Sequence, residues 1–470
     1  EPCARHPVPG TRYMRARYHG LMSRAGSFVR ESVIPMVRLA VPVIAAELGW
    51  MAMGVVDTLM VAPLGPAALG GANIGSSLFI AVGIFGMGLL LGLDTTVAQA
   101  FGAGDLEECD RWLIAGLWLA VVATLPLAVI MWLLIGSLPR LGFHPHVLPH
   151  VTAYFPIVTL SLPPLLAYAA LRRYLQARSH AGAIAFALVS ANLVNVAANA
   201  ALIHGFGPLP ALGVSGAAWA TVISRCYMVA VLAWVVWRLH RGGERAHLSW
   251  AFPAARLRRL LVLGLPAAAH LTFEVGVFSA VTALAGQLRP EALAAHQIAL
   301  NVASVVFMVP LGVSSAAAVL VGQHIGGRSA AGARHAGWAA IGLVQVFMLA
   351  SALILITVPG PFIRAFTVDA AVVAIGTQLL AVAATFQLFD GLQVTTTGAL
   401  RGLGETRAPM LISLVGYWIT GLPFGWWLCF RAGYGVAGLW MGLAASLCLV
   451  GTALLLLWRA RIGRIALVLP

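Results

Sequence analysis

The sequence has little charge for its length. Charged residues make up 9% of its 470 residues, whereas a soluble protein has about 25%. Hydrophobic residues make up 60%, and the mean hydropathy is +0.92. The 15 acidic and 29 basic side chains are too few to cover a water-exposed surface of this size. This scarcity excludes a soluble enzyme, and the apolar composition excludes a disordered or fibrous chain. We expect an all-α membrane protein.

Lysine is absent and cysteine is rare. All 29 basic residues are arginine, which gives a formal net charge of +14. They stand at the ends of apolar runs rather than in a continuous patch, so we expect anionic lipid and not nucleic acid as their partner. The five cysteines show no CxxC motif and no spacing typical of a metal site. We therefore expect no cofactor, and we interpret the cysteines as small buried side chains.

Apolar runs long enough to cross a membrane recur along the chain. A membrane helix needs about 20 mostly apolar residues. Twelve such runs lie near 34–62, 73–101, 112–138, 151–172, 180–203, 209–237, 259–286, 292–325, 336–358, 370–399, 408–429 and 433–458. Placing the N-terminus inside puts nearly all arginines in cytoplasmic segments, as the positive-inside rule requires. We therefore expect both termini in the cytoplasm and, for a bacterial chain, location in the inner membrane.

A basic stretch near the midpoint divides the chain. We expect a cytoplasmic N-terminus over 1–33, a six-helix lobe over 34–238, a linker over 239–258, a second six-helix lobe over 259–458 and a tail over 459–470. The basic linker has two interpretations. It can be a regulatory patch or, more simply, a signal that faces anionic lipid and fixes the topology of the chain.

The two halves also resemble each other in sequence. At an offset of 224 residues, Gln99 aligns with Gln323 and Gly102 with Gly326, and Pro42 aligns with Pro266. Six helices per copy give both copies the same orientation, related by an axis along the membrane normal. Repeats of this kind are typical of transporters, whose substrate site lies near the midplane between the halves.

Five acids fall inside the predicted spans: Glu47, Asp57, Asp94, Glu274 and Asp390. A charged side chain at the centre of a membrane helix costs about 2.5–3.5 kcal/mol, so each needs a reason to be there. Of the acids in the second half, Glu274 is the nearest to the middle of its span. Asp57 and Asp94 have the alternative of binding backbone or hydroxyl groups near a helix end. Glu47 precedes Asp57 by ten residues and points to nearly the opposite face, at about 100° per residue.

Uncharged polar residues accompany these acids. Asn195 and Asn199 are four residues apart and share one helix face. His270 lies one turn before Glu274 and has two interpretations, sharing a proton with it or being a core histidine. Pro42 removes a backbone hydrogen bond from the first span and allows a bend there.

Buried carboxylates of this kind suit exchange transport. A carboxylate in an aqueous cavity can hold a proton, a Na⁺ ion or an organic cation, but it holds two of them at once poorly. This mutual exclusion is the physical basis of antiport. Inward movement of one positive charge down about 100 mV supplies about 2.3 kcal/mol for the opposing export.

Several short motifs give the sequence a family resemblance. They are Pro42 with Val56-Asp-Thr58, Gln99-Ala-Phe-Gly-Ala-Gly104, Asn195 to Gly205, Ala295-His-Gln-Ile-Ala-Leu-Asn301 and Leu400 to Met410. In this order and spacing, over nearly the whole chain, they resemble the multidrug and toxic compound extrusion (MATE) transporters. The resemblance implies two six-helix lobes forming a V, and cation-coupled export of cationic, amphipathic drugs by a monomer.

The resemblance also implies roles for single residues. Asp57 matches the family's acid in the first span, and Glu274 and Asp390 match the acids of the second lobe in the NorM-like branch. That branch suggests Na⁺ coupling at the second-lobe pair, with Asp57 taking part in coupling or substrate binding. Phe386 stands where this branch carries a tyrosine, one turn before the acid of the tenth span. The loss of this oxygen ligand makes H⁺ an alternative to Na⁺.

The other matched positions are expected to line or support the pathway. Pro42 matches the kinking proline and Asn195 the fifth-span asparagine, whereas Asn199 replaces a second acid found in one branch. This replacement puts a proton relay between Asn199 and Asp57 in doubt. Further support residues are expected at Glu47, Asp94, His270 and Gln297.

Three other functions compete with drug export. A flippase for a lipid-linked or polyanionic precursor would need a strongly cationic cavity, whereas the intramembrane charges here are mostly acidic. An intramembrane enzyme would need a motif such as GxSxG, HExxH or paired metal-binding aspartates, and the sequence has none of them. A purely structural membrane protein would not need five intramembrane acids.

Overall fold

The computed structural model describes residues 28–140, 142, 144–206, 210–241 and 251–468. Within these ranges the chain is helical and has no β-strand. Eleven helices are long and apolar enough to cross a membrane, and a bent pair makes up to 12. This confirms the all-α membrane fold predicted from composition.

The first half of the chain forms a helical bundle, here called the N bundle. Its elements are η1 (Val29–Val33), α2 (Ile34–Val61), η2 (Ala62–Leu64), α3 (Pro66–Leu89), α4 (Gly92–Gly102), α5 (Leu106–Ser137), η3 (Leu138–Arg140), α6 (Leu148–Thr159), α7 (Leu162–Ala177), α8 (Ala181–His204) and α9 (Val214–Arg241).

The second half forms the C bundle. Its elements are α10 (Ala254–Ala285), α11 (Pro290–Gly326), α12 (Ala330–Thr357), α13 (Pro359–Arg364), α14 (Ala370–Gly402), α15 (Arg407–Ser413), the π-helix η4 (Leu414–Gly421), α16 (Leu422–Phe430) and α17 (Gly435–Ile465). The segment from α15 through η4 to α16 is one apolar path across the membrane.

Several helices begin a turn or more before the apolar runs that predicted them. The predicted run 336–358, for example, is α12 and begins at Ala330, and the run 112–138 is α5 and begins at Leu106. The predicted run 151–172 is not one straight helix, because α6 and α7 meet at a 45° bend. The bend precedes Pro163 and Pro164. Proline has no backbone N–H group, so these residues cannot donate the hydrogen bonds that would continue the first helix.

The ends of the helices repeat between the halves. Asp105 caps α5 by accepting a hydrogen bond from the backbone nitrogen of Glu108, 2.8 Å away. Ser329, at the same place in the second half, caps α12 by accepting one from Gly332, 3.1 Å away. Each cap satisfies a backbone N–H group that the first turn of a helix leaves unpaired.

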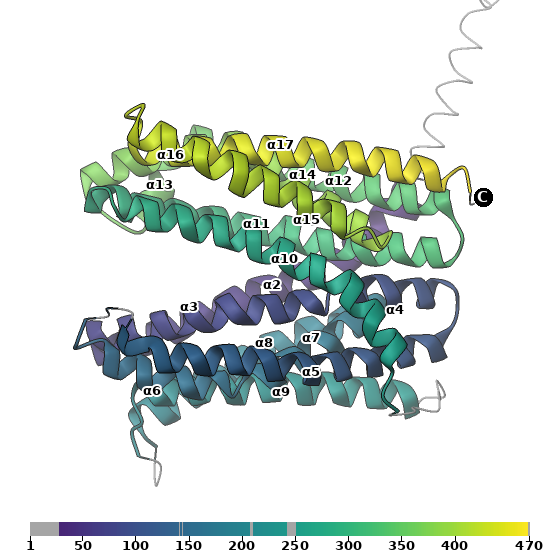
Figure 1. Cartoon of the computed structure of the whole chain (residues 1–470), viewed down its shortest axis with the longest axis horizontal. Helices are drawn as coiled ribbons and strands as arrows, with labels where there is room; N and C mark the ends of the chain where they lie inside the picture. The colour runs from purple at the N-terminus through teal and green to yellow at the C-terminus, as the bar shows by residue number, and fades with distance from the viewer. Residues whose placement is uncertain (1–27, 141, 143, 207–209, 242–250, 469–470) are drawn as a thin grey trace, which may run out of the picture.

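The two bundles lie side by side and diverge toward one end (Figure 1). We call the other end the terminal end, because α2 begins there and α17 finishes there, and we call the diverging end the far end. Helix α10 connects the bundles: it begins beside the N bundle at the terminal end and crosses into the C bundle (Figure 1). Arg256, in its first turn, forms an ion pair with Glu108 of α5, with 2.8 Å between Nη2 and Oε2.

Part of the predicted domain organisation falls outside the described residues. This holds for residues 1–27 of the expected N-terminal segment and for residues 242–250 of the expected linker over 239–258. On either side of that gap, α9 continues to Arg241 and α10 begins at Ala254, so both helices extend into the range expected for the linker.

Candidate functional site

Asp57 lies in a polar cluster inside the N bundle. Asn195 and Asn199, both fully buried on α8, donate to Asp57 Oδ1 over 3.0 and 2.7 Å. The hydroxyl of Thr221 on α9 lies 3.4 Å from Asp57 Oδ2. The shared face predicted for Asn195 and Asn199 therefore points at Asp57. The sequence argument missed Thr221, which nothing in its local pattern distinguishes from other span residues.

A buried arginine lies near this cluster. Arg225 on α9 is 7% exposed and donates to the hydroxyl of Ser161, and its guanidinium carbon lies 4.3 Å from the ring centre of Phe79. Asp57 is within its electrostatic reach. Arg225 thus places a fixed positive charge in the same bundle as Asp57, which already has two amide donors.

A small pocket opens beside Asp57. Asn73 and Ser76 of α3 and Tyr154 of α6 line it together with Asp57 and Thr58. The pocket gives Asp57 further polar neighbours besides the two asparagines.

The C bundle holds a second acidic cluster. Glu274 on α10 and Asp390 on α14 are 7% and 9% exposed, and they lie within electrostatic reach of each other. Gln393 Nε2 donates to Glu274 Oε1 over 2.6 Å. Within the described residues, neither acid forms an ion pair with an arginine or a histidine. The two carboxylates therefore share a buried site without a bonded positive charge.

His270 lines a pocket one turn from Glu274. It is 5% exposed, and its Nε2 atom has no hydrogen-bond partner in the described residues. Thr397, Arg401 and Glu405 line the same pocket. No hydrogen bond joins His270 to Glu274 in this part of the chain, so proton sharing between them stays a prediction.

The acids Glu47 and Asp94 have arginine partners. Glu47 accepts from Arg172 of α7, and both side chains are largely buried. Asp94 Oδ2 lies 3.3 Å from Nη1 of Arg173, in the N bundle, and 3.2 Å from Nε of Arg401, in the C bundle. Asp94 is fully buried. Its charge therefore bridges the two bundles near the terminal end.

More bonds join the bundles beside Asp94. The hydroxyl of Thr95 donates to the carbonyl oxygen of Arg401 over 2.5 Å, and Gln99 Nε2 donates to that of Gly402 over 3.1 Å. Gln323 Nε2 donates to the carbonyl oxygen of Ala177 over 2.8 Å. All of these bonds lie toward the terminal end, where they hold the bundles together.

Two glycines let the backbones meet at this end. A Cβ atom at Gly102 would lie 1.9 Å from the carbonyl oxygen of Gln323, and a Cβ atom at Gly326 would lie 1.9 Å from that of Gln99. The sequence repeat aligns the two glutamines with each other and the two glycines with each other, at an offset of 224. Each glutamine thus packs against the glycine of the other half, and we call this contact the reciprocal glycine contact.

A second reciprocal pair lies deeper in the bundles. A Cβ atom at Gly88 would lie 2.5 Å from the Cα atom of Ala268, and one at Gly312 would lie 3.0 Å from that of Ile44. These positions also correspond at an offset of 224. The interface between the bundles therefore has approximate twofold symmetry.

The last two predicted residues lie apart from both clusters. Pro42 is inside α2, which continues from Ile34 to Val61 without interruption. Gln297 is exposed on α11, whereas its neighbour His296 is fully buried and accepts at Nδ1 from Trp440 over 3.0 Å.

The comparisons with known proteins agree with this architecture. The MatE family model matches residues 42–201 and again residues 266–427. The chain belongs to the MatE family. The two matches begin 224 residues apart, which confirms the internal duplication. As a MatE transporter, the chain is not an enzyme.

Relatives of this MatE chain extend over nearly its whole length. The probable multidrug resistance protein NorM of Deinococcus radiodurans is 37% identical over 442 residues, covering 92% of this chain and 96% of that protein. The multidrug resistance protein NorM of Burkholderia vietnamiensis is 38% identical over 434 residues, covering 91% and 93%.

Solved structures share the fold of this MatE chain. The eukaryotic MATE transporter AtDTX14 superposes with a TM-score of 0.85 at 22% identity, covering 93% of this chain and 99% of that one. A MOP superfamily transporter from Pyrococcus furiosus superposes with a TM-score of 0.83 at 18% identity, covering 94% and 98%. At these identities the likeness concerns the fold alone.

Proposed function

We propose that this MatE transporter is a cation-coupled antiporter that exports cationic, amphipathic compounds across a bacterial inner membrane, with both termini in the cytoplasm. The names of the relatives support drug export, and the arginines at the ends of the spans support the orientation. Glu274 and Asp390 bind the coupling ion, which is Na⁺ or H⁺. Asp57 takes part in coupling or substrate binding.

The observation that carries this proposal is the difference in charge between the two clusters. Asp57 has two amide donors and lies near the fixed charge of Arg225. Within the described residues, Glu274 and Asp390 have only the amide of Gln393 as a side-chain donor, and the two carboxylates repel each other. A buried charge without a partner is costly, and so is a pair of like charges. Taking up a small cation relieves both costs, so the C bundle is the better place for the coupling ion.

Exchange follows from the same electrostatics and from the closed terminal end. When a coupling ion neutralises the carboxylates, they attract an organic cation less strongly, and the reverse also holds. The far end, where the bundles diverge, is the outer end in this orientation (Figure 1). A coupling ion that enters there displaces bound substrate to the outside. Substrate loading requires the alternative state, in which the terminal end separates.

The test uses purified chain in proteoliposomes loaded with a fluorescent cation such as ethidium. The variants Glu274→Gln and Asp390→Asn remove one negative charge each with little change in shape. We expect each to abolish ion-driven transport, whereas Glu107→Gln, which changes an exposed acid at the start of α5, should transport normally. Normal transport by both site variants would contradict the assignment of the ion site.

The identity of the ion follows from the driving gradient. A Na⁺ gradient at fixed pH and a pH gradient without Na⁺ are imposed separately on the same proteoliposomes. Transport in the first condition identifies Na⁺, and transport in the second alone identifies H⁺. If neither gradient drives transport of the cation, the proposed antiport is wrong.

A further inference from the structure

One segment of the C bundle departs from regular α-helix beside the acidic cluster. Residues Leu414–Gly421 form the π-helix η4, between α15 and α16. A π-helix adds a residue to each turn and so rotates its side chains relative to the α-helix on either side. Such segments are rare and are found frequently at functional sites.

Tyr417 lies at the centre of η4 and points into the bundle. Its side chain is 0% exposed, and its hydroxyl has no hydrogen-bond partner in the described residues. Both Glu274 and Asp390 are within electrostatic reach of it. A buried hydroxyl without a partner loses its hydrogen bonds to water and gains none in return, which is unfavourable and uncommon in native proteins. This hydroxyl therefore has an unused oxygen and an unused proton within electrostatic reach of two carboxylates.

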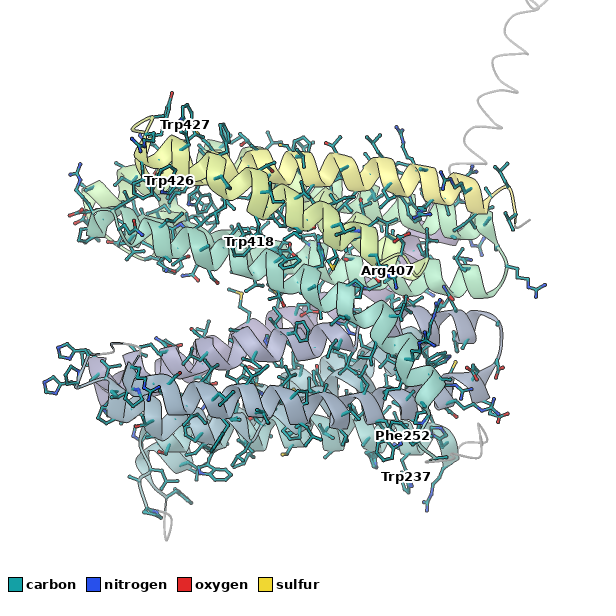
Figure 2. The ribbon with its side chains drawn as sticks, in the orientation of Figure 1. Trp237, Phe252, Arg407, Trp418, Trp426 and Trp427 are labelled. Carbon is teal, nitrogen blue, oxygen red and sulfur yellow. The ribbon has the colours of Figure 1, made fainter. Side chains whose placement is uncertain are left out.

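The neighbouring residue fixes η4 against α10 at the level of Glu274. Trp418 Nε1 donates over 3.1 Å to the carbonyl oxygen of Phe273, the residue before Glu274. Gly276 leaves room for the indole, because a Cβ atom there would lie 3.0 Å from the Trp418 ring. Trp418 lies between Trp426 at the far end and Arg407 toward the terminal end (Figure 2). The segment that carries Tyr417 is thus held against α10 at the level of Glu274.

We propose that Tyr417 is a third side chain of the C-bundle ion site. Its hydroxyl oxygen binds the coupling cation together with the carboxylate oxygens of Glu274 and Asp390. This inference rests on the proposed function. It also accounts for Phe386, which lies one turn before Asp390, packs against Trp440 and cannot supply an oxygen. Tyr417 provides that oxygen from another helix.

The test replaces this hydroxyl alone. In the proteoliposome assay, driven by whichever ion proves active, Tyr417→Phe should raise the KM for that ion about tenfold, the usual effect of losing one hydrogen bond to a charged group. The kcat at saturating ion should stay close to that of the parent chain. Tyr168→Phe is the matched control, because Tyr168 is also buried and its hydroxyl also has no hydrogen-bond partner among the described residues, but it lies in the N bundle. We expect this control to leave the KM unchanged.

A rescue variant separates ion binding from packing. Phe386→Tyr in the Tyr417→Phe background returns one hydroxyl to the site from α14, so we expect the KM to fall back toward the parent value. An unchanged KM in Tyr417→Phe, or an equal rise in Tyr168→Phe, would overturn the role of Tyr417. So would a raised KM that Phe386→Tyr does not lower.

Direct ion binding distinguishes this inference from the proposed function. Binding is measured by calorimetry with Na⁺ or, for H⁺, by proton release on adding ethidium. Glu274→Gln should lose binding, and Tyr417→Phe should bind about tenfold more weakly. Normal binding by Glu274→Gln would contradict the proposed ion site itself. Normal binding by Tyr417→Phe alone would contradict only the part assigned to Tyr417.

Discussion

Removing the charge of Asp94 should open the terminal end. Asp94 is fully buried, and its Oδ2 atom contacts Arg173 of its own bundle and Arg401 of the other at nearly equal distances, 3.3 and 3.2 Å. Removing one partner of a buried ion pair costs about 3–5 kcal/mol. Dividing this cost equally between the two arginines gives roughly 2 kcal/mol for the contact between bundles. Since 1.4 kcal/mol corresponds to a factor of ten, Asp94→Asn should shift the equilibrium more than tenfold toward separated terminal ends.

Spin labels at the terminal end measure this shift. Cysteines introduced by Glu107→Cys and Ala331→Cys lie on exposed positions of α5 and α12, one in each bundle, after the native cysteines are replaced by serine. Pulsed electron paramagnetic resonance should show one dominant short distance between the two labels in the parent chain. In Asp94→Asn it should show a new, longer distance between them. Glu405→Gln is the control, because Glu405 pairs with Arg461 inside the C bundle. The reasoning is refuted if Asp94→Asn leaves the distance distribution unchanged.

Two other substitutions test neighbouring contacts. Gly102→Ala would place a Cβ atom 1.9 Å from the carbonyl oxygen of Gln323, so the terminal ends cannot close fully. The same spin labels should then show the longer distance with no change of charge, and an unshifted distance would contradict the reciprocal contact. Glu47→Gln leaves Arg172 buried without its counter-charge, which should cost about 3 kcal/mol of stability and lower the Tm of the detergent-solubilised chain. An unchanged Tm would mean that water or another group stabilises the buried charge of Arg172 in place of Glu47.

The sequence alone predicted the spans and the duplication well, because both depend on properties that repeat along the chain. Apolar runs mark helices wherever lipid surrounds them, and a constant offset survives when two copies keep the same fold. The offset also aligned Gln99 with Gln323 and Gly102 with Gly326. The offset could not show that each glutamine contacts the glycine of the other half. Only residues near the symmetry axis contact the equivalent region of the other copy. The place of that axis depends on how the bundles pack.

The partners of the acids were the hardest part to predict. Helical periodicity separated Glu47 from Asp57, and in the structure they face different neighbours. The choice of Arg172 for Glu47, however, depends on the packing of α7 against α2. Arg172 and Arg401 looked like topology signals at the ends of spans, yet both are 8% exposed and paired with acids. An arginine at the end of a helix can satisfy the positive-inside rule and an ion pair at once, so its position in sequence does not separate the two roles.

Tyr417 had no signal in the sequence that would have revealed it. It lies in the apolar run 408–429, which predicts a span but does not indicate a π-helical segment. The π-helix over Leu414–Gly421 rotates its side chains relative to a regular α-helix, so α-helical periodicity alone would not place Tyr417 correctly.

The reciprocal glycine contact bears on the ancestry of the chain. Because each half contributes the same glutamine and the same glycine to one joint, the surface of a single half is complementary to itself, as in a twofold homodimer. A half-length chain with this surface would have the means to pair with its own copy. In the single chain, the same joint holds two halves that differ in their acids, one with an acid beside amides and the other with a carboxylate pair.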